Sequence, residues 1–142
     1  AAHARRRGVR IALENPGRDP RSYPGTFEEL RRLAEAENLG ITFDVGHANL
    51  FFRRMGVRST AGQIVRYIRR MRDLIVHVHL HDNNGVNDDH FPPGKGEIDF
   101  PRVAAAFRRV GYNGAFILEL WDPKNPLATG REGIRGARRV LS

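Results

Sequence analysis

The sequence predicts an α/β fold with a parallel sheet, built from four βα units. Short apolar segments typical of strands alternate four times with longer amphipathic segments typical of helices. Such alternation indicates parallel strands joined by right-handed crossovers. Each expected strand also ends near a side chain that could bind a metal ion. In α/β barrels, the carboxyl ends of the parallel strands carry the active site.

The first unit combines a strand over 8–15 with a helix over 26–38. Thr26 and Glu29 have the spacing of a capping box, which predicts where the helix begins. Leu30 follows at the start of an apolar stripe with helical spacing.

The other three units repeat this order. Their expected strands and helices cover residues 40–47 and 59–73, then 74–82 and 99–111, then 114–121 and about 130–141. No second domain is visible, so residues 1–142 are expected to form a single domain. Four βα units are half of an eight-stranded barrel, but four strands could also form an open three-layer sheet or a half-barrel that dimerises.

Alternation within the strands predicts which side chains share a face. In the third strand Val76, Val78 and Leu80 alternate with His77, His79 and His81. If the larger apolar side chains pack on helices, the opposite face carries polar groups at the carboxyl ends of the strands. These groups are Glu14, Asp44, His79 or His81, and Glu119.

Two glutamates, one aspartate and a histidine offer carboxylate and imidazole ligands to one divalent cation, such as Mn, Mg, Co or Zn. The chain has no cysteine, which excludes thiolate metal sites and disulfides. Taken singly, a carboxylate at a strand end can instead cap the following helix or pair with an arginine, and a strand histidine can be a hydrogen-bonded core residue. Four such strand ends on one predicted face favour the metal site.

The polar loop after the third strand contains Asp82, Asp88, Asp89 and His90, followed by PPGKG. Asn, Asp and Gly are common in ordinary solvated turns. The alternative is a mobile substrate loop that brings Asp88 and His90 over the site.

The net charge is +8, and only Lys95 and Lys124 among the 24 basic residues are lysines. The arginines are spread over several helical segments rather than concentrated in one block, which favours solvated helix faces over nucleic-acid binding as the explanation. No apolar run reaches the length of a membrane span, and the Arg-rich start lacks the apolar core of a signal peptide. We therefore expect a cytoplasmic protein without a membrane partner.

Four segments together carry a resemblance to a known family: ALENPG, FDVGHAN, HLHDNNGVNDDHFPPGKGEIDF and ILEL. They resemble the C-terminal half of the xylose isomerase-like TIM-barrel superfamily, which includes sugar and sugar-phosphate isomerases and epimerases, inosose dehydratases and the endonuclease IV family. The resemblance covers essentially the whole chain and implies four βα repeats that form half of a TIM (β/α)8 barrel.

The resemblance also implies roles for individual residues. Glu14, Asp44, His79 and Glu119 match the metal-binding quartet of the epimerases. His47 matches a position that contacts substrate in epimerases and a second metal in endonuclease IV. Asp88 and His90 are expected to contact substrate from the loop, and they match a pair that binds a further zinc ion in endonuclease IV. Asp82 is expected to orient a ligand and His77 to be structural, while the role of His81 is open.

The resemblance leaves three alternative functions open. The first is a metal-dependent sugar or sugar-phosphate isomerase or epimerase, in which Glu14 and Glu119 transfer a proton through an enediolate of a small-molecule sugar. The second is an endonuclease IV-type, zinc-dependent AP endonuclease with additional zinc and a nucleic-acid partner. It is favoured by the Asp88 and His90 pair and by the charge, and disfavoured by His81, where the nuclease motif has Asn. The third is a truncated, inactive half-barrel that binds metal.

The N-terminal half of the resembled barrel is absent from these residues. A homo-oligomer, or a separate N-terminal half-barrel, is therefore expected as the partner that completes the site.

Overall fold

The strands form one parallel sheet in the order β1-β2-β3-β4. The computed structural model describes residues 1–17, 21 and 23–142. The strands are β1 (Ala12–Glu14), β2 (Gly40–Asp44), β3 (Ile75–Leu80) and β4 (Phe116–Leu118). Consecutive strands are neighbours and helices connect them, which confirms the predicted α/β class and the βα repeat.

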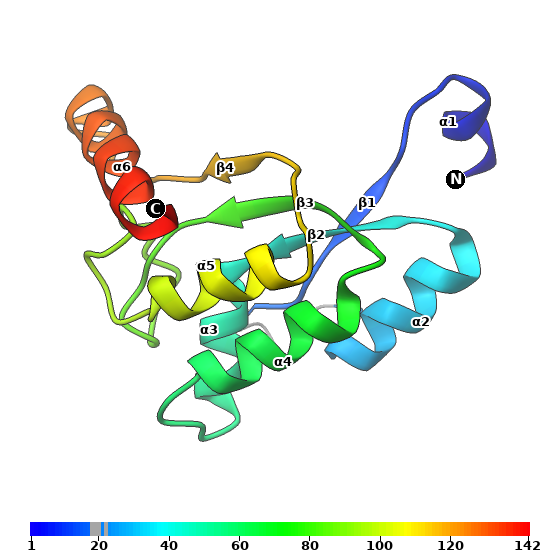
Figure 1. The fold of residues 1–142 in the computed structure, drawn as a ribbon, viewed down its shortest axis with the longest axis horizontal. Helices are drawn as coiled ribbons and strands as arrows, with labels where there is room; N and C mark the ends of the chain where they lie inside the picture. The colour runs from blue at the N-terminus through cyan, green and yellow to red at the C-terminus, as the bar shows by residue number, and fades with distance from the viewer. Residues whose placement is uncertain (18–20, 22) are drawn as a thin grey trace.

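The helices lie on one face of the sheet and at its ends (Figure 1). They are α1 (Ala2–Arg6), α2 (Phe27–Glu37), α3 (Val45–Arg54), α4 (Ala61–Met71), α5 (Phe100–Arg109) and α6 (Pro126–Leu141). Figure 1 shows α2, α4 and α5 beneath the sheet, with α1 and α6 at opposite ends. Among the described helices, none is both long and apolar enough to cross a membrane.

The predicted capping box begins α2. Thr26 Oγ1 accepts a hydrogen bond from the Glu29 backbone N–H at 3.1 Å, and Glu29 Oε2 accepts one from the Thr26 N–H at 3.1 Å. The helix ends at Asn38, whose φ of 51° lies in the left-handed region that closes many helices.

The predicted first strand, 8–15, is longer than the strand in the structure. Only Ala12–Glu14 pairs with β2, and Val9 and Ile11 are 55% and 41% exposed. In the sequence, Val9, Ile11 and Leu13 alternate with Ala12 and Glu14, which predicts that these three apolar side chains pack on helices together. For Val9 and Ile11 that prediction is wrong. The physical reason is that β1 is an edge strand, with a partner on one side alone in the described sheet, and no described helix covers its start.

The segment expected to be a loop between the second strand and the helix over 59–73 contains a helix, α3. Seven of its ten residues are buried, so the sequence lacks the polar face by which an amphipathic helix is found. Asp44 caps it by accepting a hydrogen bond from the His47 N–H at 2.7 Å. His47 therefore lies in the first turn of a helix and not at the end of a strand.

The core lies between the sheet and the helices beneath it. Phe43 of β2 contacts Phe27 of α2 and Phe107 of α5, with ring centroids 5.9 and 5.8 Å apart. Ile64 and Ile68 of α4 are fully buried in the same cluster. Val78 and Leu80 of β3 thus pack on helices as predicted. The same prediction is wrong for Val76, which is half-buried and outside the core, because the register of β3 shifts by one residue against β2 and Ile75 takes the core position. The opposite face, which no described helix covers, is left for the polar side chains.

Candidate metal centre

The four side chains predicted to bind a cation meet around one histidine. His79 Nδ1 lies 3.6 Å from Glu14 Oε2, 3.5 Å from Asp44 Oδ2 and 3.0 Å from Glu119 Oε2. Glu14, Asp44 and His79 belong to three adjacent strands, and Glu119 follows β4 directly. The parallel register brings these positions together because Asp44 pairs with His79, and His79 with Ile117.

Asp44 is the most firmly held member of this quartet. Its side chain is fully buried, and its Oδ1 caps α3. Asn15 fixes its backbone from β1, since Asn15 Nδ2 donates to the Asp44 carbonyl at 3.1 Å and Asn15 Oδ1 accepts from the Asp44 N–H at 2.7 Å. Burial alone would raise the pKa of Asp44, but contacts with His79 and His81 outweigh it and hold that pKa far below its usual range.

Several atoms at the centre of the quartet are buried without a hydrogen-bond partner among the described residues. They include Asp44 Oδ2, His79 Nδ1 and Glu119 Oε2, and ligand atoms of these three residues lie within 4.8 Å of one another. The groups are close enough to attract one another but are not aligned as hydrogen bonds. Buried polar atoms are rarely left unpaired, so this donor set fits a divalent cation at the point where the atoms converge.

A second cluster lies next to the first. Its residues are His47, His81, Asp88 and His90, which offer ligand atoms within 4.8 Å of one another. Asp88 Oδ2 is 3.2 Å from His47 Nε2 and 3.3 Å from His90 Nε2. His47 Nδ1 is also 2.7 Å from Glu14 Oε1, which joins the two clusters.

Asp82 holds the loop that carries Asp88 and His90. Its carboxylate accepts hydrogen bonds from the backbone N–H groups of Asn83, Gly94 and Ile98 at 2.9, 2.9 and 3.2 Å. Among the described residues, Asp82 contacts backbone groups and no ligand side chain, so any orientation of Asp88 and His90 by Asp82 acts through the loop. Its role is to fix the loop, since a short carboxylate can satisfy several N–H groups at once.

The structure separates the two histidines whose roles were in doubt. His81 is fully buried, with Nε2 3.1 Å from Asp44 Oδ1, and its ring stacks on that of His90 at a centroid distance of 4.0 Å. It therefore belongs to the second cluster. His77 lies further from the strand end, with its ring 5.3 Å from that of His79, and is outside both clusters.

The carboxylates around His47 change its protonation. Burial lowers the pKa of His47, but hydrogen bonds to Asp88 and Glu14 outweigh burial and raise it from 6.5 to about 11. Contact with the Asp44 carboxylate raises the pKa of His79 against the effect of burial. The metal-free clusters therefore hold protons near neutral pH that a cation must displace.

This protonation predicts how the stability of the metal-free protein depends on pH. Because the pKa of His47 is higher in the folded than in the unfolded state, protonation of His47 stabilises the folded state. This stabilisation is fully present below the unfolded pKa of 6.5 and is lost as the pH rises toward about 11. We therefore expect the temperature of the unfolding midpoint, measured in the presence of a chelator, to decrease as the pH is raised from about 7 to about 9. His47→Gln should flatten this dependence, and a midpoint that rises over the same range would contradict the assignment.

Gly46 leaves room for the His81 ring. A Cβ at this position would lie 2.0 Å from His81 Cε1, and the buried ring has little space to move. We expect Gly46→Ala to lower the free energy of unfolding by about 1–3 kcal/mol through overpacking and to weaken cation binding at the second cluster. Gly130→Ala on α6 is the matched control, since a Cβ there meets no atom within 4 Å. Equal stability of the two variants would show that the contact does not matter.

Comparison with known proteins identifies the family. The family model described as xylose isomerase-like TIM barrel matches residues 1–141. The chain belongs to the xylose isomerase-like TIM-barrel family. At 142 residues it covers a partial barrel, and the family expected from its strand-end motifs is confirmed.

Several relatives of this xylose isomerase-like chain match over most of its length. It is 36% identical over 118 residues to the uncharacterized protein MJ1311 of Methanocaldococcus jannaschii, covering 79% of this chain and 37% of the relative. It is 28% identical over 140 residues to an inosose isomerase of Bacillus velezensis, covering 94% and 47%. The chain thus spans less than half the length of these two curated relatives.

A solved structure shows the same fold. A D-tagatose 3-epimerase-like protein aligns with a TM-score of 0.68 and 29% identity, over 96% of this chain and half of the other. The chain is thus similar to an inosose isomerase in sequence and to a D-tagatose 3-epimerase-like protein in structure.

Two residues of the site were not singled out from the sequence. Asn15 directly follows Glu14 and pairs with the Asp44 backbone, and Asn at the end of a strand gives no distinctive signal. Trp121 lies beside the site and is 73% exposed. It could have been recognised from the sequence, because it is the only tryptophan of the chain and follows Glu119 by two residues.

Proposed function

We propose that the chain carries the metal-binding and proton-transfer residues of a metal-dependent sugar isomerase or epimerase. The observation that carries the proposal is the meeting of Glu14 and Glu119 at His79, at 3.6 and 3.0 Å from the same nitrogen. These carboxylates come from the two edges of the sheet, so a small substrate on the open face can lie between them.

Glu14, Asp44, His79 and Glu119 would hold the cation. Unpaired atoms of Asp44, His79 and Glu119 converge, and Glu14 Oε2 lies 3.6 Å from His79 Nδ1. Oxygen ligands with one imidazole suit Mn, Mg, Co or Zn. When bound, the cation polarises a sugar carbonyl and the neighbouring hydroxyl, which acidifies the C–H bond beside the carbonyl.

The two glutamates exchange the proton. One carboxylate takes the proton from the carbon beside the carbonyl, leaving an enediolate, and a carboxylic acid returns a proton to the same or the adjacent carbon. Return to the other face of the same carbon gives an epimer, and return to the adjacent carbon gives an isomer. Glu14 and Glu119 are 37% and 45% exposed, which leaves both accessible from the open face.

A hollow of about 430 Å³ beside the second cluster offers a place for the rest of the sugar. Its lining includes His90, Trp121 and Asp122. An exposed indole ring can stack on the apolar face of a sugar, while His47, Asp88 and His90 can hydrogen-bond its hydroxyls.

The second cluster supports a different function, zinc-dependent cleavage of a phosphodiester in DNA. Three imidazoles and one carboxylate can hold one further zinc ion beside the first cation, and paired cations activate water and stabilise the leaving oxygen. The epimerase proposal stands first because the relatives with stated activities are sugar enzymes.

One pair of assays distinguishes the two functions. The metal-loaded protein is incubated with a panel of ketoses and, separately, with a duplex that contains an abasic site. Interconversion of a ketose without cleavage of the duplex is the result we expect. Cleavage of the duplex with every ketose unchanged would refute the epimerase proposal, and metal analysis would then show at least two cations per chain.

The activity of the whole enzyme requires more surface than this chain provides. The open face and the two sheet edges leave a substrate exposed to water, whereas an eight-stranded barrel encloses it. We propose that another half-barrel, from a longer polypeptide or from a second copy, completes the site.

A further inference from the structure

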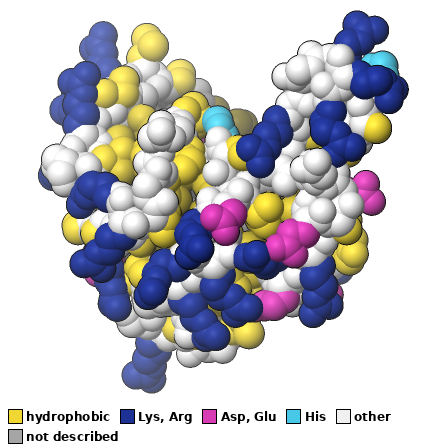
Figure 2. Space-filling view, turned by 45° about the vertical axis from the view of Figure 1, so that its right-hand side comes forward, with side chains coloured by type: hydrophobic (Ala, Val, Ile, Leu, Met, Phe, Trp, Pro, Cys, Tyr) yellow, Lys and Arg dark blue, Asp and Glu magenta, His cyan; other side chains and the backbone are white. Residues whose placement is uncertain are grey.

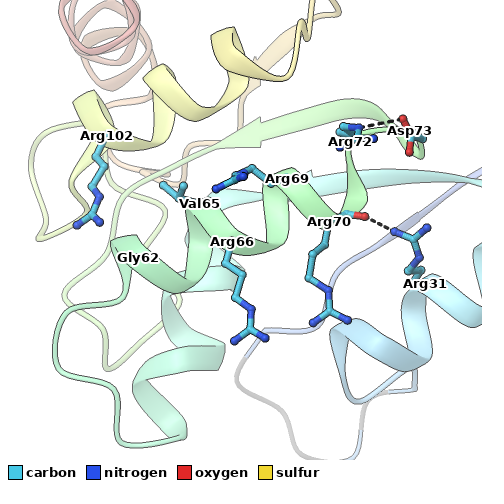
Figure 3. Close-up of a pocket in the computed structure, with 9 residues that line it drawn as sticks. All are labelled: Arg31, Gly62, Val65, Arg66, Arg69, Arg70, Arg72, Asp73 and Arg102. Atoms are coloured by element: carbon cyan, nitrogen blue, oxygen red, sulfur yellow. Dashed lines mark hydrogen bonds and ion pairs between the residues drawn. The ribbon is translucent and has the colours of Figure 1, made fainter.

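The exposed faces of α4 and α5 carry an arginine-lined surface that the proposed function does not use. Two adjoining hollows, of about 630 and 580 Å³, lie there and share Val65, Arg69 and Arg72. Figure 3 shows the residues that line the first of them. We call the arginines of these hollows the basic groove: Arg31, Arg66, Arg69, Arg70, Arg72 and Arg102 of the first, with Arg109 of the second. The fold thus gathers arginines from three helices and the turn after α4 that are spread along the sequence.

Carboxylates neutralise only part of the basic groove. Glu35 pairs with Arg31 at 2.7 Å, Glu28 lies 3.5 Å from Arg70, and Asp73 lies 3.3 Å from Arg72. The other four arginines are exposed and have no carboxylate partner among the described residues: Arg66, Arg69, Arg102 and Arg109. Figure 2 shows Lys and Arg side chains over much of the lower part of one face, with few Asp and Glu among them.

Helix stability does not account for all of these charges. Arg69, Arg70 and Arg109 lie in the last turns of their helices, where positive charge is favourable. Arg102 is the third residue of α5, and its Nη2 lies 3.8 Å from where a Cβ on Gly62 would stand, near the start of α4. The positive charge of Arg102 is unfavourable at these two helix N-termini, where the helix dipoles are positive. Asp99 caps α5 and offsets part of this repulsion. A negatively charged ligand beside Arg102 would offset the rest.

The type of partner follows from what the basic groove lacks. The large exposed apolar side chains of the described residues lie outside α4 and α5: Val9, Ile11, Tyr23, Met55, Val86, Ile117, Trp121, Leu127 and Ile134. A protein partner normally needs an apolar or aromatic centre to its interface, whereas a phosphate backbone is held by charge and by the guanidinium fork.

We propose that the basic groove binds the phosphate backbone of nucleic acid without reading the base sequence. It shares no residue with either metal cluster, so this binding is separate from any cleavage at the metal centre. The groove lies on helices α2, α4 and α5 and the turn after α4, which connect the four strands, and not at the sheet edges where another half-barrel would attach.

The test is fluorescence anisotropy with labelled oligonucleotides of mixed sequence, single-stranded and duplex, about 20 nucleotides long, in about 50–200 mM salt. We expect Arg66→Glu with Arg102→Glu to lower the affinity at least tenfold and to reduce the slope of log affinity against log salt by about two. Arg131→Glu with Arg135→Glu on α6 changes the net charge equally and is the matched control, expected to lose much less.

A second measurement separates binding from a structural role. Arg102→Glu places a negative charge at two helix N-termini, so its unfolding midpoint should be unchanged or higher while its affinity for the oligonucleotide falls. Four results would overturn the proposal: equal losses in the groove and α6 variants, full affinity in the groove variant, no binding by the wild type, or binding of polyglutamate without binding of the oligonucleotide.

Discussion

Glu119→Gln is expected to lower the rate of ketose epimerisation by about 100- to 10,000-fold, the usual contribution of a positioned acid or base. The amide keeps the shape of the side chain but cannot accept or return a proton. The fold should persist, because Glu119 Oε2 has no hydrogen-bond partner to lose. The hydrogen bonds of the Glu119 backbone, from its N–H to the Leu80 carbonyl and from its carbonyl to His90 Nδ1, remain. The initial rate of conversion, measured with saturating metal, checks the prediction.

Glu37→Gln is the matched control for this change. Glu37 is the exposed last residue of α2 and has no role in the site, so its replacement should leave the rate unaltered. A Glu119→Gln variant that binds metal and turns over at the wild-type rate would remove Glu119 from the proton-transfer pair.

Asp44→Asn is expected to weaken binding of Mn²⁺ or Co²⁺ by at least about 100-fold, since even partners of metal ligands cost 10- to 100-fold when replaced. Asparagine retains an oxygen that can cap α3, so the local helix start survives while the buried negative charge is lost. Isothermal titration calorimetry on the metal-free protein measures the change.

Asp99→Asn controls for the loss of a charged cap. Asp99 caps α5 in the same way, through its carboxylate and the Arg102 N–H at 3.2 Å, but lies outside both clusters. Asp99→Asn should bind metal like the wild type. Asp44→Asn should be the less stable of the two near neutral pH, because it also loses the charged contacts with His79 and His81. Equal affinity in Asp44→Asn and the wild type would contradict the proposed ligand set.

Strand periodicity made much of the candidate metal centre predictable. The alternation of Val78 and Leu80 with His79 placed apolar and polar side chains on opposite faces, and the parallel sheet required the strand ends to meet. The convergence of Glu14, Asp44, His79 and Glu119 follows from these two facts. The binding role of the quartet itself stays a prediction.

Other features depend on contacts that periodicity does not encode. Helix α3 was missed because it is buried on nearly all sides, so its sequence has no polar face to set its period. The role of Asp82 depends on backbone groups up to 16 residues away, whose positions only the folded loop defines. The basic groove could not be recognised for the same reason, because packing of α4 against α5 brings its arginines together.

Exchange of substrate hydrogen with solvent tests the central claim most directly. The metal-loaded protein is incubated with a ketose in deuterium oxide, and the carbon beside the carbonyl is followed by NMR. If Glu14 and Glu119 transfer a proton through an enediolate, deuterium enters at this carbon, and chelation of the metal stops the exchange. The contradicting result is retention of the original hydrogen at this carbon by a protein that holds its cation at the quartet and converts the ketose. Proton transfer through an enediolate would then be wrong.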